Sequence, residues 1–95
     1  MFINKTESGK NNLCGEAIAH FRKSLNISQR ELADRLQLIG LDVDKNAVQR
    51  MESGQRFITD IELVYLAKAL EVHLLSLFPD SSIFSNHNGS TNKTL

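Results

Sequence analysis

Two segments determine the fold: Ser28-Gln29-Arg30-Glu31-Leu32-Ala33 and, fifteen residues after Ala33, Val48-Gln49-Arg50-Met51-Glu52-Ser53-Gly54. Ser28 and Glu31 fit the S/T-x-x-E capping box, in which the hydroxyl accepts one free backbone N–H and the carboxylate accepts the N–H of the cap residue. A helix is therefore expected to begin at residue 28 or 29. Apolar residues then recur on one stripe of a 3.6-residue helix: Leu32, Ala33, Leu36 and Ile39.

The second segment is expected to form another short helix. Gly40 can adopt the left-handed conformation that ends a helix, so the chain should turn there. Asp44 is the natural N-cap of the next helix, which should end at Glu52-Ser53-Gly54. This helix needs a packing partner, because its apolar face is narrow and consists only of Ala47, Val48 and Met51. Two short capped helices joined by a turn are the layout of a helix-turn-helix unit.

The polar flank of this second helix carries four side chains that are able to recognise bases: Lys45, Asn46, Gln49 and Arg50. Arg and Lys make bidentate hydrogen bonds to guanine, and Asn and Gln make them to adenine. The same pattern also fits the solvated face of an ordinary amphipathic helix. Taken by themselves, these residues leave both interpretations open.

Further helical segments flank this unit. Ile18, Phe21 and Leu25 repeat at intervals of three and four, which predicts a helix over residues 15–25 that ends near Asn26. A second capping box, made by Thr59 and Glu62, precedes an apolar stripe that consists of Leu63, Leu66, Ala67 and Leu70. The apolar segment 72–78 is cut off by Pro79, which predicts one last short helical turn. We therefore expect an all-α fold.

Length and composition allow one small domain. The chain has 95 residues, of which residues 13–79 carry the helical pattern. Residues 1–12 are polar and aperiodic, so we expect a flexible N-terminal arm, and residues 80–95 are rich in Ser, Asn and Thr, so we expect a disordered C-terminal tail. Eleven basic residues balance eleven acidic ones, so the net charge gives nucleic-acid binding no support. Residues 20–56 alone hold seven Lys or Arg against five Asp or Glu.

The sequence gives no support to several other classes of protein. No segment approaches the roughly 18 continuous apolar residues of a membrane span, and the N-terminus has no apolar signal core, so we expect a soluble, cytoplasmic protein without a membrane partner. A single cysteine, Cys14, and three scattered histidines offer no zinc-ligand spacing, so no metal and no cofactor are expected. No nucleophile elbow, glycine-rich phosphate loop or carboxylate pair is present, so we do not expect an enzyme.

The order of these segments resembles the Cro/repressor helix-turn-helix family, also called the XRE family of bacterial and phage regulators. The matching residues span about two-thirds of the chain and are Gly15-Glu16, Ile18, Arg22-Lys23, Ile27-Ser28-Gln29, Glu31-Leu32-Ala33, Val48, Arg50-Met51-Glu52, Gly54, Leu66-Ala67-Lys68-Ala69-Leu70 and Val72. The resemblance implies a compact five-helix, lambda-repressor-like domain. Its second and third helices would form the DNA-binding pair.

The resemblance also implies roles for individual residues. Gln29 matches a family glutamine that bonds a phosphate or a neighbouring base, and the flank of the third helix matches the positions that face base edges. The loop after this helix would hold the next phosphates, in part through backbone N–H groups. Arg22 and Glu52 match an ion pair that orients the helices. With the outward-facing Arg30, the expected DNA-binding residues are Gln29, Arg30, Lys45, Asn46, Gln49, Arg50, Ser53, Gln55 and Arg56.

Two features depart from the family pattern. Between Ala33 and Val48 the chain has about five more residues than compact members, so the turn between helices two and three is expanded. Because of this longer turn, the family resemblance does not predict the tilt of the third helix. Three apolar residues are expected to pack under the turn: Leu38, Leu41 and Val43. Glu71 stands where the family commonly has a glycine that ends helix four. We expect that end to be longer or strained.

The function that the resemblance implies is sequence-specific binding to double-stranded DNA, most often to repress a promoter. Each bidentate contact discriminates by only about 1–3 kcal/mol, so a symmetric homodimer on a palindrome is expected. Candidate dimer contacts, unless they are buried within the monomer, are Leu74, Leu75, Leu77 and Phe78. One alternative is an antitoxin-like or phage-type regulator controlled by a protein partner that binds the tail. The other is a protein-interaction module that kept the fold without DNA binding.

Overall fold

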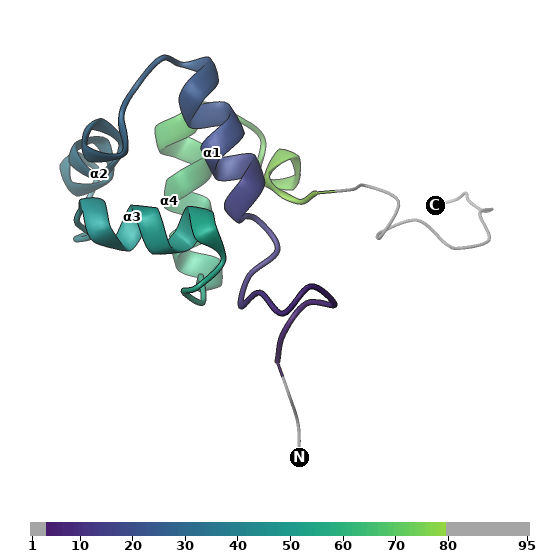
Figure 1. Ribbon diagram of the computed structural model, residues 1–95. Helices are drawn as coiled ribbons and strands as arrows, with labels where there is room; N and C mark the ends of the chain where they lie inside the picture. Colours follow the sequence, from purple (N-terminus) through teal and green to yellow (C-terminus); the bar gives the residue numbers. More distant parts are fainter. Residues whose placement is uncertain (1–3, 80–95) are drawn as a thin grey trace.

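The computed structural model describes residues 4–79, which form four α-helices and one 3-10 helix. The helices are α1 (Gly15–Ser24), α2 (Gln29–Leu38), α3 (Lys45–Ser53) and α4 (Asp60–Leu70), followed by the 3-10 helix η1 (Leu74–Leu77) (Figure 1). No strand occurs within this described range, so the expected all-α fold is confirmed. The predicted tail at 80–95 and the first three residues of the predicted arm lie outside the described residues.

The fifth helix is shorter than a five-helix domain implies. It is a 3-10 turn of four residues, because the chain is constrained at both of its ends. Glu71 turns the chain left-handed just before it, and the Val72 N–H bonds back to the Ala67 carbonyl at 3.0 Å. After it, Phe78 is extended (φ −86°, ψ 144°), as expected for a residue that precedes a proline.

The starts of α2, α3 and α4 are fixed by side-chain caps. Ser28 and Thr59 each form a complete capping box with the glutamate three residues later, as the sequence predicts. Asp44 Oδ1 accepts the Ala47 N–H at 2.8 Å, which confirms it as the N-cap of α3. The positions of the three helix starts are therefore set by local sequence.

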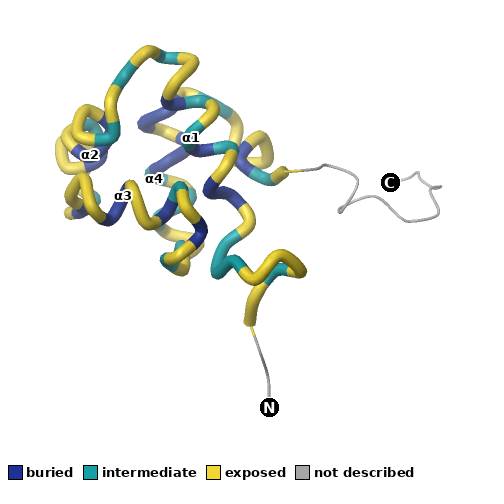
Figure 2. The backbone as a smooth tube through the Cα atoms, in the orientation of Figure 1, coloured by how far each residue is buried: buried dark blue, intermediate teal, exposed yellow. Residues whose placement is uncertain are grey.

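The core lies where the helices face one another. α3 packs against α1 and α2, while α4 packs against α1 and α2 and contacts η1 (Figure 1). Figure 2 shows buried residues on the facing sides of these helices and exposed ones on their outer sides. The largest fully buried side chains are Ile18, Leu32, Leu36, Val48, Met51, Leu66, Leu70 and Leu77. Burying one such side chain contributes about 1.5–3 kcal/mol, so the short α3 is stabilised mainly by packing.

The expanded turn between α2 and α3 packs only partly under the domain. Val43 is buried and Leu41 is half-buried, as expected, but Leu38 is 86 % exposed and Ile39 is 43 % exposed. Both expectations of burial were wrong, because α2 ends at Leu38 and Gly40 (φ 109°) reverses the chain there. The Leu41 N–H then bonds back to the Leu36 carbonyl at 2.8 Å, which brings Leu41 inward.

The end of α4 is strained rather than extended. Glu71 is the C-cap in the left-handed region (φ 61°, ψ 41°), where a side chain costs about 1 kcal/mol relative to glycine. Its carboxylate lies 3.8 Å from Arg35 and is 74 % exposed, so this ion pair contributes little. We expect Glu71→Gly to raise the free energy of unfolding by about 1 kcal/mol. Urea denaturation checks this, with Glu71→Ala as the control; an equal gain from alanine would show that the carboxylate, not the backbone, is responsible.

Candidate DNA interface

The polar flank of α3 is fully presented to solvent. Ala47, Val48 and Met51 are buried on one side of the helix, and the four residues expected to face bases are exposed on the other: Lys45, Asn46, Gln49 and Arg50. None of these four side chains has a hydrogen bond or ion pair with any residue from 4 to 79. The expanded turn does not cover them. The flank is therefore free to contact a ligand.

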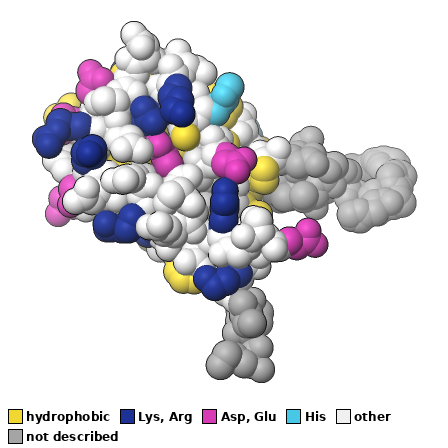
Figure 3. Space-filling view, viewed as in Figure 1, with side chains coloured by type: hydrophobic (Ala, Val, Ile, Leu, Met, Phe, Trp, Pro, Cys, Tyr) yellow, Lys and Arg dark blue, Asp and Glu magenta, His cyan; other side chains and the backbone are white. Residues whose placement is uncertain are grey.

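Lys and Arg side chains are spread over the face of the molecule seen in Figure 3, around the positions of α1, α2 and α3, with acidic side chains between them. Arg30 is exposed on the first turn of α2, and it lines a polar hollow between α2 and the start of α3 together with Lys45 and Asn46. Asp34 and Asp44 also line this hollow. The structure thus places the outward-facing Arg30 beside the α3 flank.

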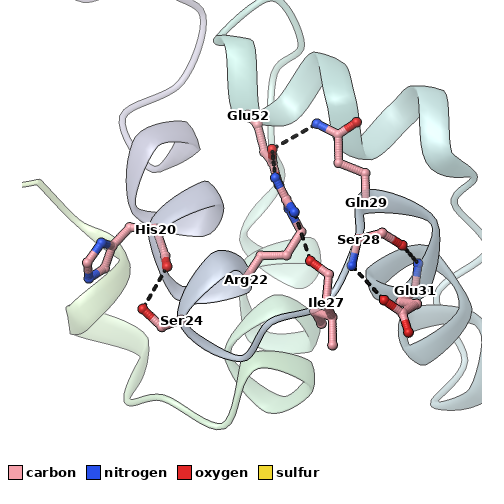
Figure 4. Close-up of polar contacts among 8 residues, drawn as sticks. All are labelled: His20, Arg22, Ser24, Ile27, Ser28, Gln29, Glu31 and Glu52. Atoms are coloured by element: carbon pink, nitrogen blue, oxygen red, sulfur yellow. Dashed lines mark hydrogen bonds and ion pairs between the residues drawn. The ribbon is translucent and has the colours of Figure 1, made fainter.

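One buried carboxylate joins the three helices behind this face. Glu52 on α3 accepts Arg22 Nε at 2.6 Å and Arg22 Nη2 at 3.1 Å, a bidentate pair in which both side chains are about 90 % buried (Figure 4). Arg22 Nη1 also donates to the Ile27 carbonyl in the α1–α2 connection. Gln29 Nε2 donates to Glu52 Oε1 at 2.9 Å. The geometry therefore fixes α3 relative to α1 and holds the Gln29 amide in one orientation.

The loop after α3 presents fewer free donors than the family resemblance implies. The backbone N–H groups of Gln55 and Arg56 both bond the Arg50 carbonyl, at 3.0 and 3.2 Å. Ser53 and Gln55 are exposed, but Ser53 Oγ is bonded to the same carbonyl. These bonds close the end of α3, so the side chains of the loop, rather than those two N–H groups, are available to a phosphate.

Arg56 is engaged by a carboxylate of α4. Its Nη1 and Nη2 donate to Glu62 Oε1 and Oε2 at 2.9 and 3.0 Å, and Nη1 also donates to the Phe57 carbonyl. The hydrogen bond to Glu62 raises the pKa of the Arg56 guanidinium, and burial acts in the opposite direction. The guanidinium remains charged and partly exposed, but it faces α4 through this pair.

The same pair makes stability depend on acid. The hydrogen bond from Arg56 holds the pKa of the Glu62 carboxyl below its usual value of 4.5, against the effect of burial. A carboxyl whose pKa is lowered by folding stabilises the protein above its unfolded pKa, and this contribution is lost as the pH falls through the folded pKa. We expect the free energy of unfolding to fall below about pH 4.5 and Glu62→Gln to flatten this fall. Urea denaturation at a series of pH values checks both, and an unchanged profile in Glu62→Gln would assign the fall to other carboxylates.

Asn11 and Asn12, which lie before α1, were not among the predicted site residues. Both bond backbone carbonyls at the end of α3 and in the loop that follows it. The available signal was an asparagine three residues before a helix start: Asn12 Oδ1 accepts the Gly15 N–H at 2.8 Å. The bonds to α3 join residues about forty positions apart, and no local pattern indicates them.

The candidate dimer contacts separate into two groups. Leu74 and Leu75 are 37 % and 58 % exposed, whereas Phe78 is half-buried against the core. Leu77 is fully buried, so its assignment as a dimer contact was wrong. It lies on the inner side of the 3-10 turn and packs with the core, which leaves it no surface for a second chain.

Comparison with known proteins assigns this chain to a family. The sequence model of the helix-turn-helix family matches residues 18–77, from α1 through η1. The chain belongs to the Cro/repressor (XRE) helix-turn-helix family. This helix-turn-helix protein is also similar to the crystal structure of the restriction-modification controller protein C.AhdI from Aeromonas hydrophila, with 31 % sequence identity and a TM-score of 0.59. The match covers 67 % of this chain and 89 % of the controller chain. No curated protein sequence matches.

The family is one of DNA-binding transcriptional regulators. Within residues 4–79, no helix has the length and apolar character of a membrane span. The same residues contain no cluster of metal-ligating side chains. Burial raises the pKa of the Cys14 thiol to about 11, so the thiol stays protonated at neutral pH and packs as a small apolar side chain in the core.

Proposed function

We propose that this protein binds double-stranded DNA sequence-specifically and represses transcription by occupying a promoter, rather than acting as an enzyme. The observation that carries the proposal is the flank of α3, whose Lys45, Asn46, Gln49 and Arg50 side chains are exposed and have no bonded partner among residues 4–79, while the opposite side of the helix is buried. Inserted into a major groove, a helix of this kind directs such side chains at base edges. With this function we expect the protein to act in the cytoplasm, as regulators of this family do.

The other expected DNA-binding residues take supporting roles. Gln29, held by Glu52, keeps one amide N–H and its Oε1 for a phosphate or base at the start of α2. Arg30 lies beside the flank of α3, at the polar hollow between α2 and the start of α3. Ser53, Gln55 and Arg56 contact the phosphates that follow, and phosphate contacts fix the register of a protein on DNA without reading sequence.

We further propose that the protein binds as a homodimer on a palindromic site. One α3 contacts too few bases for a unique site, and the usual solution is two half-sites about one helical turn apart. Leu74 and Leu75 supply exposed apolar surface for the second copy, and the half-buried Phe78 is the C-cap residue of the same 3-10 turn. A two-fold axis through this surface would bring the same patch of each chain together.

Selection from a random duplex pool at low salt tests these proposals together. Enrichment of an inverted repeat, with centres about 10 base pairs apart, supports a symmetric dimer. Enrichment of one unrepeated half-site contradicts the dimer but retains sequence-specific binding. No enrichment contradicts the proposed function and favours a protein-interaction module. Transcription in vitro from a promoter that overlaps the selected site should fall as protein is added; a rise would identify an activator.

A further inference from the structure

The residues before α1 form hydrogen bonds with the C-terminal end of α3. The segment runs from α1 past this end of α3 (Figure 1). Asn12 Nδ2 donates to the Met51 carbonyl at 3.0 Å and to the Arg56 carbonyl at 2.8 Å. The neighbouring Asn11 donates its backbone N–H to the Gly54 carbonyl at 2.8 Å and its Nδ2 to the Gln55 carbonyl at 2.9 Å. Two consecutive asparagines therefore bond carbonyls over the last turn of α3 and the loop after it.

These bonds satisfy groups that the helix itself leaves open. The last four carbonyls of an α-helix have no intrahelical donor, and they need a partner when they are not in water. The Arg50 carbonyl is used by the loop, which bonds it through the Gln55 and Arg56 N–H groups, whereas the Met51 carbonyl accepts Asn12 as well as the Gly54 N–H. Asn12 thereby connects the last turn of α3 to the loop that follows it.

Asn12 also ties this end of α3 to α1. Its Oδ1 accepts the Gly15 N–H at 2.8 Å, so one amide group bonds α1 through its oxygen and α3 and its loop through its nitrogen. The two helices approach closely here: a Cβ placed on Gly15 would lie 2.4 Å from the Met51 carbonyl oxygen. Little displacement of the α3 end is possible while both sets of bonds are made.

We propose that Asn12 is a positioning residue for DNA recognition, which sets the end of α3 and its loop at the angle needed for the α3 flank to meet the bases. Asn12 acts through α3 and is not proposed to touch DNA. The inference rests on the proposed function of sequence-specific DNA binding. The Glu52 network holds the inner side of α3, and Asn12 with Asn11 holds its C-terminal end, so the helix is fixed at two separate places.

The chemistry of the amide provides variants that separate its two bonds. Asn12→Asp keeps an oxygen for the Gly15 N–H, and so keeps the bond to α1, but it removes both donors and places a carboxylate against the Met51 and Arg56 carbonyls. Asn12→Ser keeps a shorter oxygen without the added charge. Asn4→Asp is the matched control, because it makes the same change of charge on the same segment at an exposed residue.

The measurement is the ratio of affinity for the selected site to affinity for random duplex, with each variant below its melting temperature. We expect Asn12→Asp and Asn12→Ser to lower this ratio about tenfold, the effect of losing one bidentate base contact, while Asn4→Asp leaves it unchanged. A merely structural role would lower both affinities or the melting temperature without changing the ratio. If the Asp variant does not fold, the Ser variant decides. Wild-type ratios in the folded Asn12 variants would overturn the proposal.

Hydrogen exchange gives a second readout that needs no DNA. The Gln55 and Arg56 amides, which bond the Arg50 carbonyl, should exchange faster in both Asn12 variants than in Asn4→Asp. Unchanged exchange would show that Asn12 does not hold the loop and would overturn the inference. A wild-type protein that selects no sequence, with an exchange pattern that changes as expected, would contradict the proposed function and the role in recognition that depends on it. That result would still support the contact by which Asn12 holds the loop after α3.

Discussion

Arg22→Ala is expected to lower the free energy of unfolding by about 3–5 kcal/mol, because it leaves the Glu52 carboxylate buried without its charge partner. Glu52 is held in two bonds by Arg22, and both side chains are about 90 % buried. The change also removes the donor to the Ile27 carbonyl. In a domain of this size, such a loss lowers the melting temperature by more than about 10 °C.

Urea and thermal unfolding followed by circular dichroism measure this effect. Glu16→Ala is the control, because it breaks the Lys10–Glu16 pair, whose carboxylate is 80 % exposed, and it should cost less than about 1 kcal/mol. Similar losses in the two variants would mean that burial does not strengthen the Arg22–Glu52 pair.

A double variant separates stability from orientation. Replacing both charges, as Arg22→Met with Glu52→Met, removes the uncompensated buried charge and should recover much of the lost stability. It also removes the acceptor that holds Gln29. We therefore expect discrimination between cognate and random DNA to stay below that of the wild type even where the variant is folded. If the double variant recovers both the stability and the DNA discrimination of the wild type, the Glu52 network has only a structural role.

The parts of the fold that the sequence predicts are those set by neighbours along the chain. Ser28, Asp44 and Thr59 cap helices as expected because each cap bonds a backbone N–H only three residues away. The buried stripes of α2 and α4 follow the helical period for the same reason. Leu38 and Ile39 depart from this pattern because α2 ends at the first of them, and helix ends depend on where the chain must go next.

The parts that the sequence does not predict depend on contacts between distant residues. The sequence places Arg56 in a loop and predicts no partner for it. Only the folded chain shows that Glu62, which already takes part in the capping box of α4, also binds Arg56. The Asn12 bonds to α3 are of the same kind. Leu77 and Leu75 are both leucines of the same apolar segment, yet the 3-10 turn buries Leu77 and exposes Leu75. In each case tertiary geometry selects among side chains that local sequence treats alike.

Arg50→Ala is expected to weaken binding to the selected site by about 1–3 kcal/mol for each half-site, the value of one bidentate contact to a base. Binding to random duplex should fall much less, because there the guanidinium contributes only one charge among several. Folding should be unaffected, since the Arg50 side chain is exposed and has no bonded partner within residues 4–79.

Titration of both duplexes at one salt concentration, with Arg56→Ala as the comparison, checks this expectation. Arg56 lies in the phosphate-contacting loop and is turned toward Glu62, so its removal should weaken cognate and random DNA about equally and should also destabilise the start of α4. The contrast between the two arginines is the decisive quantity, because both changes remove the same charge. Equal losses on both duplexes for Arg50→Ala would remove Arg50 from the residues that read sequence and would transfer that role to Asn46 and Gln49, the remaining side chains of the flank suited to adenine.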